Sequence, residues 1–180
     1  TTVHDYPKYT GAYSRSEQTV KAAMAKYPSV KVVLDVHRDA MISNDKHIKP
    51  TATVNGQKAA QMMIIAGVVS TGALPHPNWE QNFRFAVRLQ QSLATTYPDL
   101  MRPLCLVASR YNQHLANGYL LVEIGTDVNT VSEAVSAPHT KASLITYENN
   151  KLRTRYAEYL KVRELPPGGS DISIADTIAE

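Results

Sequence analysis

Cysteine, tryptophan and phenylalanine are scarce in this chain of 180 residues, which has one Cys, one Trp and two Phe. The lone Cys105 excludes an internal disulfide framework and any cysteine-rich zinc module. Every apolar run is far shorter than the ~20 residues that cross a bilayer, so we expect no transmembrane segment and no signal peptide in it. Charged residues make up only 19% of the chain and form no block of one sign, which argues against disorder.

The rest of the composition is typical of a globular domain. Hydrophobic residues make up 43% of the chain, and a domain of this size buries roughly two-thirds of its unfolded surface. The net charge is +3 with both signs interspersed, a balance that argues against a dedicated nucleic-acid binder. Ten tyrosines would suit a sugar-binding cleft, although tyrosine also covers ordinary half-buried surface.

Apolar periodicity and capping residues predict three helices. In a capping box, a hydroxyl and a carboxylate satisfy each other's free backbone amides at a helix start. One such box pairs Ser14 with Glu17, and a second pairs Thr130 with Glu133. The predicted helices cover residues 14–27, 79–97 and 130–145.

Short apolar segments, often β-branched, predict a buried sheet. These segments cover residues 30–36, 62–66, 104–107 and 119–125. The dipeptide Asn55-Gly56 predicts a β-hairpin between residues 51–54 and the residues after Gln57. The alternation of strands and helices predicts an α/β fold, with a mostly parallel central sheet and helices on both faces.

The sequence changes character after Tyr147. Residues 148–180 contain only a weak helical pattern around residues 152–159 before Pro166-Pro167-Gly168-Gly169 interrupts any regular element. The last ten residues have the composition of a tail or linker. We therefore predict one domain over residues 1–147 and an extension over residues 148–180.

Two predicted strands carry reactive side chains to the same edge of the sheet. The first ends in Val36-His37-Arg38-Asp39 and the last in Val122-Glu123-Ile124-Gly125, and ligands in open α/β sheets bind beyond the carboxyl ends of strands. A neutral imidazole fixed at a strand end is a good zinc ligand, so His37 is the candidate ligand. Apolar neighbours raise the pKa of a glutamate, which suits Glu123 to move a proton from zinc-activated water to a departing amine.

The alternative interpretation is that His37 and Glu123 have structural roles. A histidine at a strand end is more often a hydrogen-bonded structural residue than a ligand, and Glu123 could form an internal ion pair with Arg38. His47 and His76 lie among turn residues, and we expect both to be exposed. No nucleophile elbow, phosphate-binding glycine loop or dinucleotide fingerprint offers a different chemistry.

Several segments together resemble the stage II sporulation protein P family. They are Tyr13-Ser14-Arg15-Ser16, Leu34-Asp35-Val36-His37-Arg38-Asp39-Ala40, Tyr111-Asn112-Gln113, and Leu121-Val122-Glu123-Ile124-Gly125-Thr126 with Asn129. The segments occur in the family's order between residues 1 and 145. The resemblance implies a zinc-dependent cell-wall hydrolase related to N-acetylmuramoyl-L-alanine amidases, with their three-layer α/β fold over residues 1–147.

The resemblance also implies a biological role. Such an enzyme would use one zinc ion to cleave the amide between N-acetylmuramic acid and L-alanine of peptidoglycan, and would also have peptide-cleaving activity. It would thin the septal wall during engulfment, outside the cytoplasm at the membrane between mother cell and forespore, as part of a membrane-anchored parent. Its partners would be peptidoglycan and stage II sporulation proteins D and M.

By this resemblance, His37 would be a zinc ligand and Glu123 the catalytic carboxylate. Arg38 and Asp39 would contact the substrate or support the zinc ligand. The motif Tyr111-Asn112-Gln113 would shape the substrate cleft.

The family's first zinc ligands, a histidine and a glutamate, match nothing in residues 1–16. We therefore expect an amino-terminally truncated domain that lacks the first strand and two of three protein ligands for zinc, and that is inactive on its own. One alternative is a non-catalytic peptidoglycan-binding or scaffold domain in which His37 is structural. Another is an α/β fold of unrelated function, which predicts that His37 and Glu123 lie far apart.

Overall fold

The computed structural model describes residues 3–68 and 74–137, and these residues belong to one compact unit. The predicted helix around residues 152–159 and the whole extension over residues 148–180 lie outside the described residues. The end of the predicted helix over residues 130–145 also lies outside them, since its described part covers residues 131–137.

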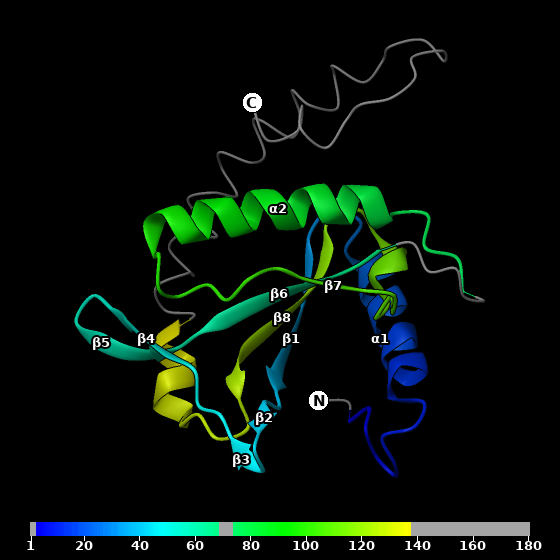
Figure 1. Cartoon of the computed structure of the whole chain (residues 1–180). Helices are drawn as coiled ribbons and strands as arrows, with labels where there is room; N and C mark the ends of the chain where they lie inside the picture. Colours follow the sequence, from blue (N-terminus) through cyan, green and yellow to red (C-terminus); the bar gives the residue numbers. More distant parts are fainter. Residues whose placement is uncertain (1–2, 69–73, 138–180) are drawn as a thin grey trace. The chain divides into compact units, whose positions relative to one another are not determined.

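A four-stranded sheet forms the centre of the fold (Figure 1). Its strands, in spatial order, are β1 (Val33–Asp39), β8 (Tyr119–Thr126), β6 (Met62–Gly67) and β7 (Cys105–Val107). Strand β1 pairs with β8 and strand β6 with β7 in parallel, whereas β6 and β8 run antiparallel. The predicted α/β fold with a mostly parallel sheet is confirmed, and the antiparallel pair is an addition to it.

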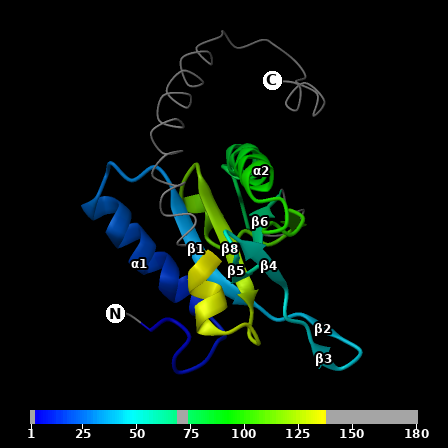
Figure 2. The same ribbon diagram turned by 90° about the vertical axis from the view of Figure 1, so that its left-hand side faces the viewer.

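Two helices lie on opposite sides of this sheet. Figure 2 shows α1 (Ala12–Lys26) on one side and α2 (Trp79–Thr96) on the other. The side chains between α2 and the sheet form the hydrophobic core, which includes Ala86, Leu93, Ile64, Leu120 and Val122. Helix α1 buries none of its own residues completely, yet Tyr119, Leu121 and Glu123 of β8 are buried on the sheet face below it.

Strand β1 begins and ends three residues later than the prediction of residues 30–36. His37, Arg38 and Asp39 therefore lie within the strand and not beyond its end. Because side chains alternate along a strand, His37 and Asp35 share one face of the sheet, while Arg38 points to the other.

One predicted capping box is confirmed and the other is wrong. The Glu133 amide donates to Thr130 Oγ1 at 3.2 Å, and the Thr130 amide donates to Glu133 Oε2 at 2.9 Å. Helix α1 instead begins at Ala12, where Gly11 takes the left-handed conformation with φ of 82°. Ser14 therefore lies inside the helix, and Glu17 forms an ion pair with Lys21 at 2.6 Å.

Two small hairpins extend from the sheet. Strands β4 (Thr51–Val54) and β5 (Gln57–Ala60) pair across Asn55-Gly56, as predicted. A second hairpin, between β2 (Ile42–Ser43) and β3 (Lys46–His47), was not predicted and turns at two residues of positive φ. Within residues 3–68 and 74–137, no helix is both long and apolar enough to cross a membrane.

Candidate functional site

His37 and Glu123 are neighbours across the parallel strands β1 and β8. Residues in register on adjacent strands direct their side chains to the same face of a sheet. The Tyr13 ring of α1 stacks on the His37 imidazole, with ring centroids 6.1 Å apart and planes 15° apart. The two candidate residues therefore share the sheet face that α1 covers.

The Glu123 carboxyl group is buried and incompletely paired. The residue is 8% exposed, and Oε2 has no hydrogen-bond partner among the described residues. Burial raises the pKa of Glu123, and the nearby carboxylate of Asp39 raises it further, while His37 and Arg102 oppose the shift. The sequence predicts a raised pKa for Glu123, and burial is the main cause of that rise.

The imidazole of His37 is half-buried and has one close polar partner. Its Nε2 atom lies 3.0 Å from Asp35 Oδ1. This hydrogen bond raises the pKa of His37, partial burial opposes the rise, and the charges of Asp35 and Glu123 support it. His37 is therefore held beside two carboxyl groups on one face of the sheet.

Arg38 and Asp39 make contacts that tie the ends of strands together. The Arg38 guanidinium donates to the backbone oxygens of Thr126 and Asn129, so it pairs with the turn after β8 and not with Glu123. A structural role for Glu123 predicted an ion pair between Arg38 and Glu123. The described contacts of Arg38 do not include this ion pair. Arg102 Nη1 donates to Asp39 Oδ2 at 2.8 Å, and the two side chains form an ion pair.

The motif Tyr111-Asn112-Gln113 brings one aromatic ring to the cluster around Glu123, which consists of Glu123, His37, Asp35, Tyr13, Asp39 and Arg102. Tyr111 and Asn112 both adopt positive φ, 41° and 62°, an uncommon conformation for residues other than glycine. The Tyr111 ring lies 5.2 Å from the Tyr13 ring between centroids. Asn112 Nδ2 donates to the Tyr13 backbone oxygen at 2.9 Å and to Ser16 Oγ at 3.0 Å, so this loop is fastened to α1.

Gln113 lies in the interior and holds the same loop to the sheet. Its side chain is fully buried, accepts from the Gly67 amide and donates to the Ile65 oxygen, both at 2.9 Å. Its own backbone oxygen accepts from Asn82 Nδ2 of α2 at 2.7 Å. Gln113 and Asn112 therefore position Tyr111, which is the member of the motif beside the cluster.

Three residues of the cluster were not predicted as site residues. Asp35 could have been found, because it is two positions before His37 and period two places both on one strand face. Tyr13 and Arg102 come from α1 and from the segment before β7, and no local pattern links either residue to Glu123. Only the tertiary fold brings these two side chains to the site.

Comparison with known proteins identifies the family. Residues 1–146 match the family described as stage II sporulation protein P. The chain belongs to the stage II sporulation protein P family. The resemblance seen in the sequence is thereby confirmed over nearly the same residues.

One curated relative of the family is stage II sporulation protein P of Bacillus subtilis (strain 168). It is 28% identical to this chain over 141 residues. The match covers 76% of this chain and 33% of the relative, so the chain spans about a third of that protein's length. No solved structure gives a significant match.

The described part of this stage II sporulation protein P domain does not form a complete metal site. Nowhere in it do three or more His, Cys, Asp or Glu side chains lie close enough together to hold a metal ion. The chemistry of the cluster nevertheless suits zinc in part, since it offers the imidazole of His37 and the buried, unbonded Oε2 of Glu123. The described residues thus fit one ligand and one acid–base group, but not a full set of ligands.

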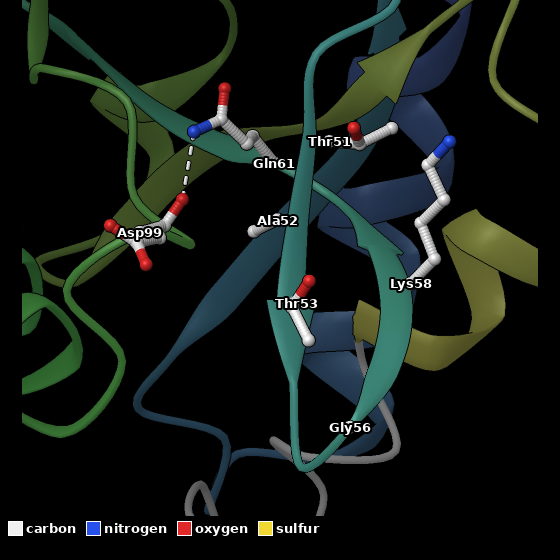
Figure 3. A pocket seen from close by; sticks show the side chains of 7 residues that line it. All are labelled: Thr51, Ala52, Thr53, Gly56, Lys58, Gln61 and Asp99. Carbon is white, nitrogen blue, oxygen red and sulfur yellow. Dashed lines mark hydrogen bonds between the residues drawn. The ribbon is translucent and has the colours of Figure 1, made fainter.

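A separate polar hollow lies beside the β4–β5 hairpin (Figure 3). It is lined by Thr51, Ala52, Thr53, Gly56, Lys58, Gln61 and Asp99. Gln61 Nε2 donates to the Asp99 backbone oxygen at 2.7 Å across one side of it. None of its lining residues belongs to the cluster around Glu123, so the two features are distinct.

Proposed function

We propose that this chain supplies the catalytic carboxylate and one zinc ligand of a peptidoglycan hydrolase that acts during sporulation. The reaction would be hydrolysis of the amide between N-acetylmuramic acid and L-alanine of the stem peptide. The observation that carries the proposal is the buried Glu123 carboxyl group in register with His37. Family membership supports the sporulation setting, as does the name of the Bacillus subtilis relative.

Glu123 has the properties of a group that moves protons. Hydrolysis of an amide removes a proton from the attacking water and delivers one to the leaving nitrogen as the carbon–nitrogen bond breaks. A carboxyl group whose pKa is raised by burial is closer to the pH at which both transfers are efficient. Its Oε2 atom, which has no hydrogen-bond partner in the described part of the chain, can accept the proton from water.

His37 would hold the zinc ion through one ring nitrogen, and further ligands would come from residues outside the described ones. Bound zinc would polarise the scissile carbonyl and make water more acidic. The ion pair between Asp39 and Arg102 would keep a balanced charge beside Glu123. The rings of Tyr13 and Tyr111 would offer apolar faces on the α1 side, which suits the sugar of the substrate.

The proposed setting is the septal wall during engulfment. The enzyme would thin this wall from the extracytoplasmic side, at the membrane between mother cell and forespore, in a membrane-anchored parent protein. Peptidoglycan would be the substrate, and stage II sporulation proteins D and M would be partners. Release of stem peptide from purified walls is the activity on which this setting depends.

The test compares variants of the full-length protein with zinc present, using release of stem peptide from purified peptidoglycan. Glu123→Gln should lower the rate by roughly 100-fold or more, because removal of an acid–base group costs about that much. His37→Ala should lower both the rate and the zinc content. Glu80→Gln and His47→Ala are matched controls at partly exposed positions, and both should keep the wild-type rate.

The same experiment separates the alternative function. If Glu123→Gln and His37→Ala release stem peptide at the wild-type rate, the catalytic proposal is wrong. If neither they nor the wild type release any peptide, but all sediment with purified walls, the domain is a peptidoglycan-binding or scaffold domain. Zinc content measured on the same samples shows whether His37 contributes a ligand.

A further inference from the structure

Asp35 and His37 form a contact that the proposed acid–base chemistry does not use. The two residues occupy alternate positions of β1, so their side chains lie on the same face of the sheet. Asp35 Oδ1 and His37 Nε2 are 3.0 Å apart. Both side chains are partly covered, with 24% of Asp35 and 34% of His37 exposed.

The chemistry of the contact determines which nitrogen of His37 carries the proton. A carboxylate can only accept hydrogen bonds, so the hydrogen must lie on Nε2. A neutral imidazole carries one N–H, and the other nitrogen then has a free lone pair. Among the described residues, no hydrogen bond is formed by His37 Nδ1.

A second contact restrains the ring from another direction. The Tyr13 ring stacks on the imidazole face, while Asp35 holds the Nε2 edge. Tyr13 is itself fixed, because its backbone oxygen accepts from Asn112 Nδ2 at 2.9 Å. The imidazole is therefore restrained at one edge and one face by residues of β1 and α1.

We propose that Asp35 is a positioning residue that holds neutral His37 with its hydrogen on Nε2, which leaves on Nδ1 the lone pair that would bind zinc. Ligating histidines commonly donate their second N–H to a carboxylate, which fixes the ring and makes the ligand more basic. Binding through Nε2 would require the 3.0 Å hydrogen bond to Asp35 to break. The part of this inference that concerns zinc rests on the proposed function, whereas the position of the hydrogen does not.

The position of the hydrogen is tested without metal, by ¹⁵N NMR of the histidine-labelled, zinc-free protein at alkaline pH. Wild-type His37, assigned by its loss in His37→Gln, should give the pattern of the Nε2–H form. Asp35→Ala should convert that signal to the average of both forms. An Nδ1–H pattern in the wild type, or no change in Asp35→Ala, would overturn the proposal.

The chain contains a matched control for this measurement. His47 contacts a carboxylate through its other nitrogen, with Nδ1 2.7 Å from Asp127 Oδ2. His47 should therefore give the Nδ1–H pattern, and Asp127→Ala should change His47 while His37 keeps its signal. Asp35→Asn keeps the shape and one accepting oxygen, so it serves where Asp35→Ala does not fold and should retain part of the Nε2–H preference.

A second measurement concerns zinc and separates this inference from the proposed function. In the full-length protein, Asp35→Asn should weaken zinc binding by about 10- to 100-fold, the usual effect of losing a carboxylate behind a ligating histidine. Unchanged zinc affinity in Asp35→Asn would refute the positioning role. If the wild type binds no zinc at all while the NMR result holds, the proposed function fails and Asp35 still sets the tautomer of His37.

Discussion

His37 of β1 lies in parallel register with Glu123 of β8, so an imidazole and a buried carboxyl group share the sheet face below α1. An α/β fold of unrelated function predicts that these two side chains lie far apart. Their parallel register contradicts that prediction. The register between β1 and β8 also depends on residues that contact neither His37 nor Glu123, because residues packed beside β8 hold that strand in place.

Gln113 should be important for stability, not for contact with substrate. Gln113→Ala would leave the Gly67 amide and the Ile65 oxygen without their partners in the interior. Each buried unpaired group costs about 1–3 kcal/mol, so the free energy of unfolding should fall by about 2–5 kcal/mol. Urea unfolding measures this change, and Gln18→Ala at an exposed position of α1 should change it by less than about 0.5 kcal/mol.

Gly125 should tolerate no side chain. Its φ is 64°, and an added Cβ would lie 2.5 Å from Asn129 Oδ1 and 2.8 Å from Ala60 Cβ. Gly125→Ala should destabilise the protein by about 2–5 kcal/mol, because it combines backbone strain with loss of the hydrogen bond from the Thr126 amide to Asn129.

Gly56 provides the control for this prediction. It has φ of 77° but nothing within 4 Å of an added Cβ, so Gly56→Ala should cost only the backbone strain of about 1–2 kcal/mol. Equal losses of unfolding free energy in the two variants would mean that the contacts with Asn129 and Ala60 contribute nothing.

Local sequence signals predicted most of the elements, but they missed the β2–β3 hairpin, the start of α1 and the contacts that only tertiary packing makes. The Asn55-Gly56 hairpin and the box of Thr130 with Glu133 depend on residues adjacent in the sequence, and both are confirmed. His76 was expected to be exposed but is only 7% exposed, because the fold packs it near Gly67 and His114. A turn-like local sequence carries no information about such packing.

The sequence also predicted part of the site, namely its two central residues. His37 and Glu123 could be placed together because the carboxyl ends of parallel strands meet at one edge of a sheet. The sequence also predicted that both strands are buried, but β1 is an edge strand without a fully buried residue. The antiparallel direction of β6 and the approach of Tyr13 and Arg102 depend on how the connecting segments fold back. No spacing within the sequence encodes these contacts.

Glu133 should stabilise the protein in a pH-dependent manner. The Thr130 amide, together with Lys49 and Asn129, lowers the pKa of Glu133 from 4.5 to about 2. Its contribution to stability is therefore fully present above pH 4.5 and is lost as the pH falls towards 2. Glu133→Gln should unfold at lower urea than the wild type at pH 7, and the difference should shrink between pH 4.5 and 2. A difference that is the same at pH 7 and pH 2.5 would contradict this assignment.

The contributions of His37 and His76 to the free energy of unfolding should change in opposite directions as the pH rises through neutrality. The hydrogen bond that His37 donates to Asp35 raises the pKa of His37 above 6.5, so the contribution of His37 to stability is present below pH 6.5 and is lost as the pH rises through the raised pKa. Burial, supported by the charges of His114 and Arg110, lowers the pKa of His76. Its contribution is present above pH 6.5 and is lost as the pH falls through the lowered pKa.

Two variants separate these contributions in urea unfolding measured between pH 5 and pH 8. His76→Phe keeps a ring of similar shape without a titrating group, so it should lose less stability than the wild type between pH 6.5 and pH 5. His37→Gln should lose less stability than the wild type as the pH rises above 6.5. If both variants follow the wild-type profile, neither imidazole is perturbed by its surroundings, and the hydrogen bond between Asp35 and His37 is then too weak to hold the ring.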